Sequence, residues 1–189
     1  MKNLDHIVSE FLKGQDVSEE IVKAVTSILD TFSVKKGATL LQRGAICKHI
    51  YIVETGLIRQ YYYKDGCDIT EHLAMDMQGF LCIESFIESK PSRLIVEALE
   101  DSVIYGLPKD KLEELGMRYP EMETVYRKIM ERSLIMSQKR MESLHFETAR
   151  GRYLKLLKYS PSIIQRVPSM YIASYLGITP ETLSRVKGY

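Results

Sequence analysis

Apolar positions near the N-terminus recur three and four residues apart. Between residues 4 and 29 this spacing is typical of amphipathic helices that bury one face. Gly14 and Asp16 interrupt the pattern, and both residue types favour breaks in a helix. The sequence therefore predicts two short helices in this segment.

From residue 32 to residue 107 the pattern changes to short β-branched and aromatic runs separated by turn signals. Residues 50–53 and 57–63 read as strands joined at a glycine, and an Asp65-Gly66 turn leads into a further strand at 69–73. Short strands in such close succession predict an antiparallel barrel or a jelly-roll-like double-sheet roll. The glycines form neither a phosphate loop nor a dinucleotide fingerprint.

A helical pattern returns after Pro108, first as a short helix at 109–115 and then as a long helix that Pro120 opens and that runs to Leu144. The apolar residues of the long helix occupy adjacent faces, which predicts cover from more than one side. We expect the β-roll to pack against one side of the helix, and the same helix of a second copy of the chain to pack against the other side in a dimer. A purely intramolecular core helix remains the alternative. The spacing rests on Met122, Val125, Ile129 and Met136.

Two helical segments close the chain. Residues 146–158 predict a helix that ends at Ser160-Pro161-Ser162, and residues 169–189 have the pattern of a helix-turn-helix. Ala173 is the small residue where the two helices meet, and Gly177 supplies the turn. The apolar anchors are Ile172, Leu176, Ile178, Leu183 and Val186.

The second helix of this motif has a strong start signal and a polar outer face. Thr179 suits the N-cap and Pro180 the first helical position. Glu181 and Arg185 lie one turn apart, which allows a surface ion pair, and both side chains suit base edges in a major groove. A helical hairpin that binds another protein is the alternative. The expected outer face consists of Glu181, Ser184, Arg185 and Lys187.

Charge is distributed unevenly along the chain, although the 189 residues carry a net charge of only +1. Residues 139–189 contain nine basic and three acidic residues, so the C-terminal part has a net charge of +6 and the remainder −5. A basic end on an acidic body indicates a surface that binds a polyanion. A solvated basic helix surface would also explain the charge alone.

The cysteines, the histidines and the lack of a catalytic motif argue against several classes of protein. The three cysteines, Cys47, Cys67 and Cys82, form no CxxC pair, so neither a disulfide scaffold nor a thiolate metal site is expected. The four histidines form no HxH or HxxxH pair, and no catalytic set is legible, so we expect no metal, no cofactor and no enzyme. Without an apolar run of membrane length or a signal peptide, the chain is expected in the cytoplasm. The histidines are His6, His49, His72 and His145.

Taken together, the acidic β-rich body, the long helix at 120–144, the segment Thr148–Leu154 and the motif Ile178–Arg185 resemble the Crp/Fnr transcription regulators. The resemblance implies an α+β fold. It implies a cyclic-nucleotide-binding-like β-roll over 1–118, a dimerisation helix over 119–144 and a helix-turn-helix over 145–189. It also implies double-stranded DNA with a palindromic site as a partner, bound by a homodimer, with RNA polymerase and a small-molecule effector as further partners.

The resemblance also implies roles for single residues. Positions that match Pro180, Glu181, Ser184 and Arg185 face the bases in that family, and Ser169 and Thr179 lie where phosphate contacts are usual. With their neighbours, the candidate DNA-binding residues are Ser169, Thr179, Pro180, Glu181, Thr182, Ser184, Arg185 and Lys187.

Two departures from the family pattern shape the expectations. Where the family's cAMP cassette has a ribose-binding Glu and a phosphate-binding Arg, this chain has Leu81-Cys82-Ile83 and Ser92-Arg93-Leu94, so cAMP binding is not expected. An iron–sulfur cluster is not expected either, because the N-terminus has no cysteine cluster. The chain stops at Tyr189, so little or no wing is expected after the recognition helix. The candidate effector pocket consists of Cys82, Glu84, Ser92 and Arg93.

Other readings stay open at this point. A ligand-binding or protein-interaction module with a vestigial helix-turn-helix is the main alternative, and a cupin-like enzyme is a third. For Cys82 a redox role is conceivable, but a buried structural thiol is favoured.

Overall fold

The computed structural model describes residues 4–13 and 17–188. Helices α1 (Leu4–Phe11) and α2 (Glu19–Ser27) confirm the two predicted N-terminal helices. Gly14 and Asp16, the predicted break between them, lie outside the described residues, as does Tyr189.

Two four-stranded antiparallel sheets form the β-rich body, which confirms the predicted double-sheet roll. The hairpin turn at Asp65 and Gly66 has φ values of 51° and 76°, as a tight primed turn requires, and it joins β4 to β5. The first sheet runs in the order β1 (Asp30–Val34), β8 (Ser102–Pro108), β3 (His49–Thr55) and β6 (Gly79–Phe80). The second runs in the order β2 (Thr39–Leu41), β7 (Ile95–Ala98), β4 (Leu57–Lys64) and β5 (Cys67–Met75).

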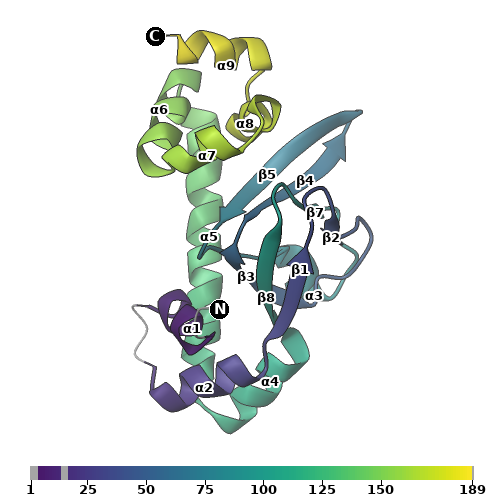
Figure 1. Cartoon of the computed structure of the whole chain (residues 1–189), viewed down its shortest axis with the longest axis vertical. Coiled ribbons are helices and arrows are strands. Elements are labelled where there is room, and N and C mark those ends of the chain that lie inside the picture. Colours follow the sequence, from purple (N-terminus) through teal and green to yellow (C-terminus); the bar gives the residue numbers. More distant parts are fainter. Residues whose placement is uncertain (1–3, 14–16, 189) are drawn as a thin grey trace.

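Helices surround the roll. A short helix that the sequence did not predict, α3 (Ile83–Glu88), lies between β6 and β7. The predicted helix after Pro108 is α4 (Lys109–Arg118), and it continues three residues beyond its expected end. The long helix α5 (Glu121–Phe146) runs along one side of the roll, from α4 at one end to the C-terminal helices at the other (Figure 1).

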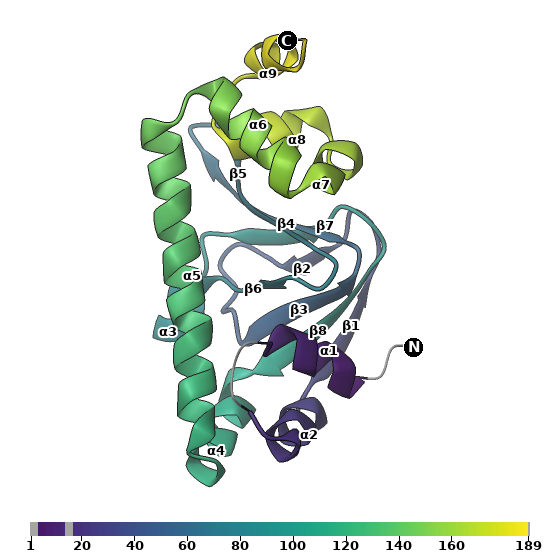
Figure 2. The same cartoon turned by 90° about the vertical axis from the view of Figure 1, so that its left-hand side faces the viewer.

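The C-terminal part consists of four helices that sit together at one end of the molecule (Figure 2). The helix expected at 146–158 is α6 (Ala149–Tyr159); it starts later because Phe146 belongs to α5 and the Thr148 side chain caps α6 by accepting from Gly151 N. The expected end at Ser160-Pro161-Ser162 opens another helix, α7 (Pro161–Arg166), because proline suits a first helical position. The helix-turn-helix follows as α8 (Ser169–Leu176) and α9 (Pro180–Lys187).

Two clusters of buried apolar residues hold the fold together. The larger fills the space between the sheets and extends under α1, α2, α4 and the first half of α5. The smaller joins Leu57, Leu73 and Met75 of the second sheet to α6, α7, α8 and α9. The C-terminal helices therefore share a core with the roll instead of standing apart from it.

Candidate nucleic-acid interface and cavity

The turn between α8 and α9 has the predicted geometry. Gly177 adopts the left-handed conformation, with φ of 63°, and ends α8. Thr179 caps α9, where its Oγ1 accepts a hydrogen bond from Thr182 N at 3.2 Å. Ala173 and Leu183 are buried between the two helices, as expected for the small residue and an anchor. The local sequence signals thus fix both the angle and the start of α9.

The outer face of α9 is exposed and polar. Glu181, Ser184, Arg185 and Lys187 are all exposed. The spacing of Glu181 and Arg185 allows an ion pair, but the contact that Arg185 makes is with Thr182, because its Nη2 donates to Thr182 Oγ1 at 3.1 Å. The hydroxyl of Thr179, followed by the backbone of α9, lowers the pKa of Glu181.

The candidate DNA-binding residues gather at one end of the molecule. Ser169 begins α8, Thr179 precedes α9, and the others belong to α9 itself. Lys187 Nζ donates to Ser169 Oγ at 3.1 Å, so the last turn of α9 meets the first turn of α8. These contacts place the residues together; their role in DNA binding stays a prediction.

The opposite side of the helix-turn-helix is fastened to the roll. Ser174 Oγ of α8 accepts from Thr70 N at 2.8 Å and donates to Asp68 O at 3.1 Å, so α8 extends the edge of β5 through a side chain. Arg140 of α5 donates to the carbonyls of Thr70 and Tyr175, at 3.2 Å and 2.9 Å. Three elements far apart in the sequence therefore meet at one point on β5.

A buried arginine lies beneath this junction. Arg59 of β4 is 1% exposed, and its guanidinium pairs with Asp68 and Glu97. The same group lies 3.7 Å from the centre of the Tyr171 ring of α8, a distance typical of a cation–π contact. A charge buried in a strand is stable only with such partners, and here one of them belongs to α8.

A second arginine fastens α7. Arg166 pairs with Glu100 at 2.6 Å and with Asp76 at 2.5 Å, and it donates to Gly56 O at 2.9 Å. Burial is the largest single influence on the pKa of Asp76 and raises it, but the hydrogen bonds from Arg166 and Gly56 N together with the charge of Arg166 outweigh it, so the net shift is downward. Sequence analysis missed the roles of both arginines; for Arg59 the available signal was a basic residue within a strand of the β-rich body.

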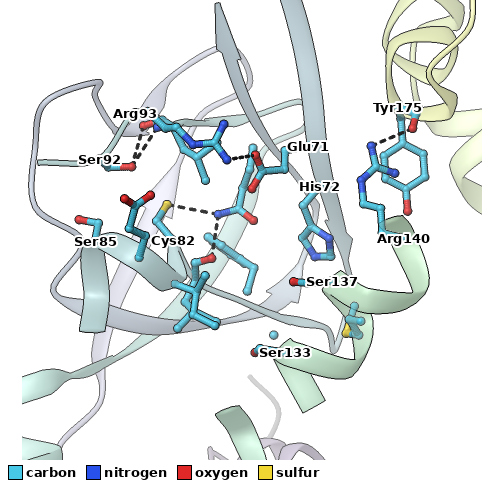
Figure 3. A pocket seen from close by; sticks show the side chains of 18 of the residues that line it. Glu71, His72, Cys82, Ser85, Ser92, Arg93, Ser133, Ser137, Arg140 and Tyr175 are labelled. Carbon is cyan, nitrogen blue, oxygen red and sulfur yellow. Dashed lines mark hydrogen bonds and ion pairs between the residues drawn. The ribbon is translucent and has the colours of Figure 1, made fainter. Parts of the chain in front are cut away.

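A cavity of about 240 Å³ lies between the roll, α5 and α8 (Figure 3). All four candidate pocket residues line it, namely Cys82, Glu84, Ser92 and Arg93. Sequence analysis missed the wall opposite to them, which consists of Ser133, Ser137 and Arg140 from α5, Glu71 and His72 from β5, and Tyr175 from α8. The cavity is therefore lined by the roll, by α5 and by the first helix of the helix-turn-helix.

Most charged groups around the cavity already have partners. Arg93 Nη2 bonds to Glu71 Oε2 at 2.9 Å, and its guanidinium stacks 4.6 Å from the centre of the Tyr62 ring. Burial, followed by the charge of Arg140, lowers the pKa of His72 to about 4, so this imidazole is neutral at pH 7. The lining thus combines a satisfied arginine, carboxylates and a neutral imidazole.

The second half of α5 exposes an apolar surface. Met122, Val125 and Ile129 of the first half are buried against the roll. Beyond them the large apolar residues face solvent: Leu134 (67% exposed), Ile135 (53%), Met136 (46%), Met141 (48%), Leu144 (40%) and Phe146 (85%). We call these six residues the α5 apolar stripe. So many large apolar side chains are rarely exposed close together on the surface of a single soluble chain.

Comparison with known proteins places these features in context. The cyclic nucleotide-binding domain family matches residues 31–119. The transcriptional activator protein FnrA of Stutzerimonas stutzeri is 27% identical over 93% of this chain and 73% of its own length. The fumarate and nitrate reduction regulatory protein of Escherichia coli K12 is 30% identical over 82% of this chain and 66% of its own length.

Solved structures share the fold. FixK2 from Bradyrhizobium japonicum superposes with a TM-score of 0.69 at 22% identity, covering 85% of this chain and 83% of that one. A putative transcriptional regulator of the crp/fnr family from Eubacterium rectale gives a TM-score of 0.70 at 22% identity, covering 92% and 83%. Within the described residues, none of the helices has both the length and the apolar character needed to cross a membrane.

Proposed function

Because this chain belongs to the Crp/Fnr family of transcription regulators, we propose that it binds a palindromic site on double-stranded DNA as a homodimer. The observation that supports this most is the exposed face of α9. The N-cap of α9 and the turn before it are formed as in a helix-turn-helix, and the polar side chains on its outer face are exposed to solvent. Arg185 would donate to guanine O6 and N7, and Glu181 would accept from cytosine N4. Ser169 and Thr179 would contact phosphates at the ends of this face.

The α5 apolar stripe supports the dimer. A twin copy of α5 packed against it would bury side chains that are now 40% to 85% exposed. Two recognition helices related by a two-fold axis would then enter successive major grooves, about 34–36 Å apart. In this proposal residues 1–118 form the sensor domain, 119–144 the dimerisation helix and 145–189 the DNA-binding domain.

We also propose that the cavity does not take cAMP. Two guanidinium groups line the cavity: that of Arg93 is paired with Glu71, and that of Arg140 donates to the carbonyls of Thr70 and Tyr175. Glu84 adds a second carboxylate to the lining. A buried cyclic phosphate needs a free bidentate donor, and like charges beside it would oppose binding. An effector of another chemical class would fill the cavity, and RNA polymerase would contact the dimer on DNA.

Substitution of Arg185 tests base reading. On a duplex that carries the preferred site, we expect Arg185→Ala to weaken binding by about 1–3 kcal/mol and to relax preference at one base pair in each half-site. Fluorescence anisotropy on the site and on its single base-pair variants measures both effects.

Arg118→Ala is the matched control, because it removes the same charge from the last turn of α4, a helix at the far end of α5 from α9. This control should bind like the wild type. If Arg185→Ala lost the same free energy on every duplex, Arg185 would contact phosphate and the base-reading role would be wrong.

A further inference from the structure

A second cavity, of about 210 Å³, lies beside the first, between the roll, α1, α5 and the helices α6 and α7. His72 and Ser133, which Figure 3 shows in the first cavity, line both. The four candidate pocket residues do not line the second cavity, so it is a separate site. We call it the α5–α7 cavity. Its apolar wall includes Phe11, Ile50, Leu73, Phe80, Leu156 and Ile163.

Contacts outside the α5–α7 cavity hold parts of its wall in place. The ring of Phe80, a wall residue, stacks on the Tyr51 ring with 4.9 Å between the ring centres. Gln78, which also lines the cavity, accepts a hydrogen bond at Oε1 from Met75 N at 3.0 Å. The wall is therefore formed before a ligand enters, as in most sites for small molecules.

The charged side chains that line this cavity are both cationic. Lys128 and Arg132 lie one turn apart on α5 and are exposed, and within the part of the chain that the structure describes no carboxylate lines the cavity. Lys128 Nζ pairs with Glu131, a residue outside the lining, at 3.2 Å. The Arg132 guanidinium makes no hydrogen bond or ion pair with another described residue. Like charges at this spacing repel each other, so an anion bound between them would be stabilised.

The apolar wall and the two cations together indicate the class of ligand. Phe80 and Ile163 are only 3% and 4% exposed, so a hydrocarbon group placed against them would leave water. A carboxylate beside Arg132 would form a bidentate pair with its guanidinium. An amine would meet two like charges, and an inorganic anion would leave the apolar wall uncovered. The first cavity differs, because Glu71 and Glu84 line it.

We propose that the α5–α7 cavity binds a small amphipathic carboxylate, with its hydrocarbon chain against the apolar wall and its carboxylate on Arg132 and Lys128. Drug-sized ligands fill pockets of about 300–1,000 Å³, so the volume of this cavity, about 210 Å³, suits a smaller molecule. A medium-chain fatty acid has this size and chemistry.

The bound carboxylate would contact the C-terminal helices as well as the roll. Leu156 belongs to α6 and Ile163 to α7, whereas Ile50 and Leu73 belong to the two sheets. The hydrocarbon chain would therefore bridge the roll and the helices that precede the helix-turn-helix. The binding itself does not rest on the proposed function, because it requires neither DNA nor an occupied first cavity.

Isothermal titration calorimetry of the full-length protein with sodium octanoate tests the proposal. Titrations with 1-octanol and octylamine accompany it, because the three compounds share one hydrocarbon chain and differ in the charge of the head group. We expect saturable binding of one octanoate per chain, weaker binding of 1-octanol and no saturable binding of octylamine. The proposal would be overturned if octanoate did not bind saturably, or if 1-octanol or octylamine bound as tightly as octanoate. This comparison uses the wild type, so it holds even if a variant fails to fold.

Two variants locate the carboxylate on the protein. Arg132→Gln removes one of the two cations and should weaken octanoate binding about tenfold, while the affinity for 1-octanol stays unchanged. Arg127→Gln is the matched control, because Arg127 is exposed on the same helix, pairs with Glu131 at 3.0 Å and does not line the cavity. This control should bind octanoate like the wild type, and equal losses for the two variants would contradict the site.

A third variant separates the cavity from the α5 apolar stripe. Leu134 belongs to the stripe and does not line the cavity, so Leu134→Ala should leave octanoate binding unchanged. Loss of octanoate binding in Leu134→Ala, with wild-type binding in Arg132→Gln, would place the ligand on the stripe and overturn the proposal.

Discussion

The two sides of the helix-turn-helix differ in how their polar groups are used. On the side of α8 and α7, Ser174 and Arg166 bond to β5 and to the loops around it. On the side of α9, Ser184, Arg185 and Lys187 are exposed, and the partners of the two cations are hydroxyls of the motif itself. The first set joins the motif to the roll, whereas the second set faces solvent on α9, which lies farther from the roll than α7 and α8 (Figure 1).

This difference shows how one residue type, arginine, can either hold two parts of the chain together or stay exposed on a surface. A guanidinium surrounded by carboxylates, such as that of Arg166, directs donors of all three of its nitrogens at groups of this chain. A guanidinium whose bond is to one hydroxyl, such as that of Arg185, exchanges that bond for a base edge at small cost. The number of partners and the burial, more than residue type, therefore distinguish the side that is fastened to the roll from the exposed side that we propose reads the bases.

Removal of a contact between the C-terminal helices and the roll should have the largest effect, and this effect is on the free energy of unfolding. Arg59→Ala leaves Asp68 and Glu97, both partly buried, without their cation and removes the contact with Tyr171. We expect the free energy of unfolding to fall by about 3 kcal/mol, since removal of one partner strands buried charge. Urea unfolding followed by circular dichroism measures it.

Arg93→Ala is the matched control, because it breaks an ion pair of β-roll residues that is largely exposed. Its cost should stay below about 1 kcal/mol. Equal costs for the two variants would show that the buried arginine network does not hold the C-terminal helices to the roll.

The next effect concerns the α5 apolar stripe. Leu134 is 67% exposed in the single chain, and in the proposed dimer it packs against the twin helix. We expect Leu134→Ala to weaken dimerisation by about 2 kcal/mol while leaving the fold of each copy intact. Sedimentation equilibrium over a range of concentrations gives the dissociation constant.

Met117→Ala is a control for removal of an exposed apolar side chain, since Met117 of α4 is 87% exposed and lies outside the stripe. A monomeric wild-type protein at every concentration, or an unchanged constant for Leu134→Ala, would remove the stripe from the interface.

The smallest expected effect is on DNA affinity, and it tests whether α6 lies beside the proposed DNA-binding face of α9. Lys158 of α6 is exposed and its ammonium lies over the Tyr159 ring, 5.2 Å from the ring centre, whereas Lys155 is paired with Glu147 at 2.7 Å. If Lys158 binds a phosphate, Lys158→Ala weakens binding on all sequences and lowers the slope of log K against log salt by about 0.9 for each phosphate that the protein no longer neutralises. Titrations at several salt concentrations measure the slope.

Lys155→Ala should change the slope less, because its partner already neutralises it. An unchanged slope for both variants would place α6 away from the DNA backbone.

Local signals in the sequence predicted most of the elements. The Asp65-Gly66 turn, Gly177 and the cap at Thr179 each depend on neighbours within a few residues, and the structure confirms all three. The short helices α3 and α7 were missed because six residues give too little periodicity to recognise. For α7, Pro161 was interpreted as the end of a helix although it begins the next one.

Contacts between distant segments could not be predicted. The bond between Ser174 and β5, the ring of Tyr171 over Arg59 and the α5 wall of the cavity all depend on how the C-terminal helices pack on the roll. No local pattern encodes that packing. The candidate residues of α9 and one wall of the cavity were therefore accessible from the sequence, whereas the opposite wall and the fastened side required the structure.

The most direct test of the central claim is selection from random-sequence duplex DNA with the purified protein at near-physiological salt and without added ligand. The account predicts enrichment of a palindrome whose half-sites are about one helical turn, or roughly 10 base pairs, apart. Enrichment of sequences without two-fold symmetry would contradict the dimer, and no enrichment, even after addition of cell extract to supply an effector, would contradict DNA reading by α9.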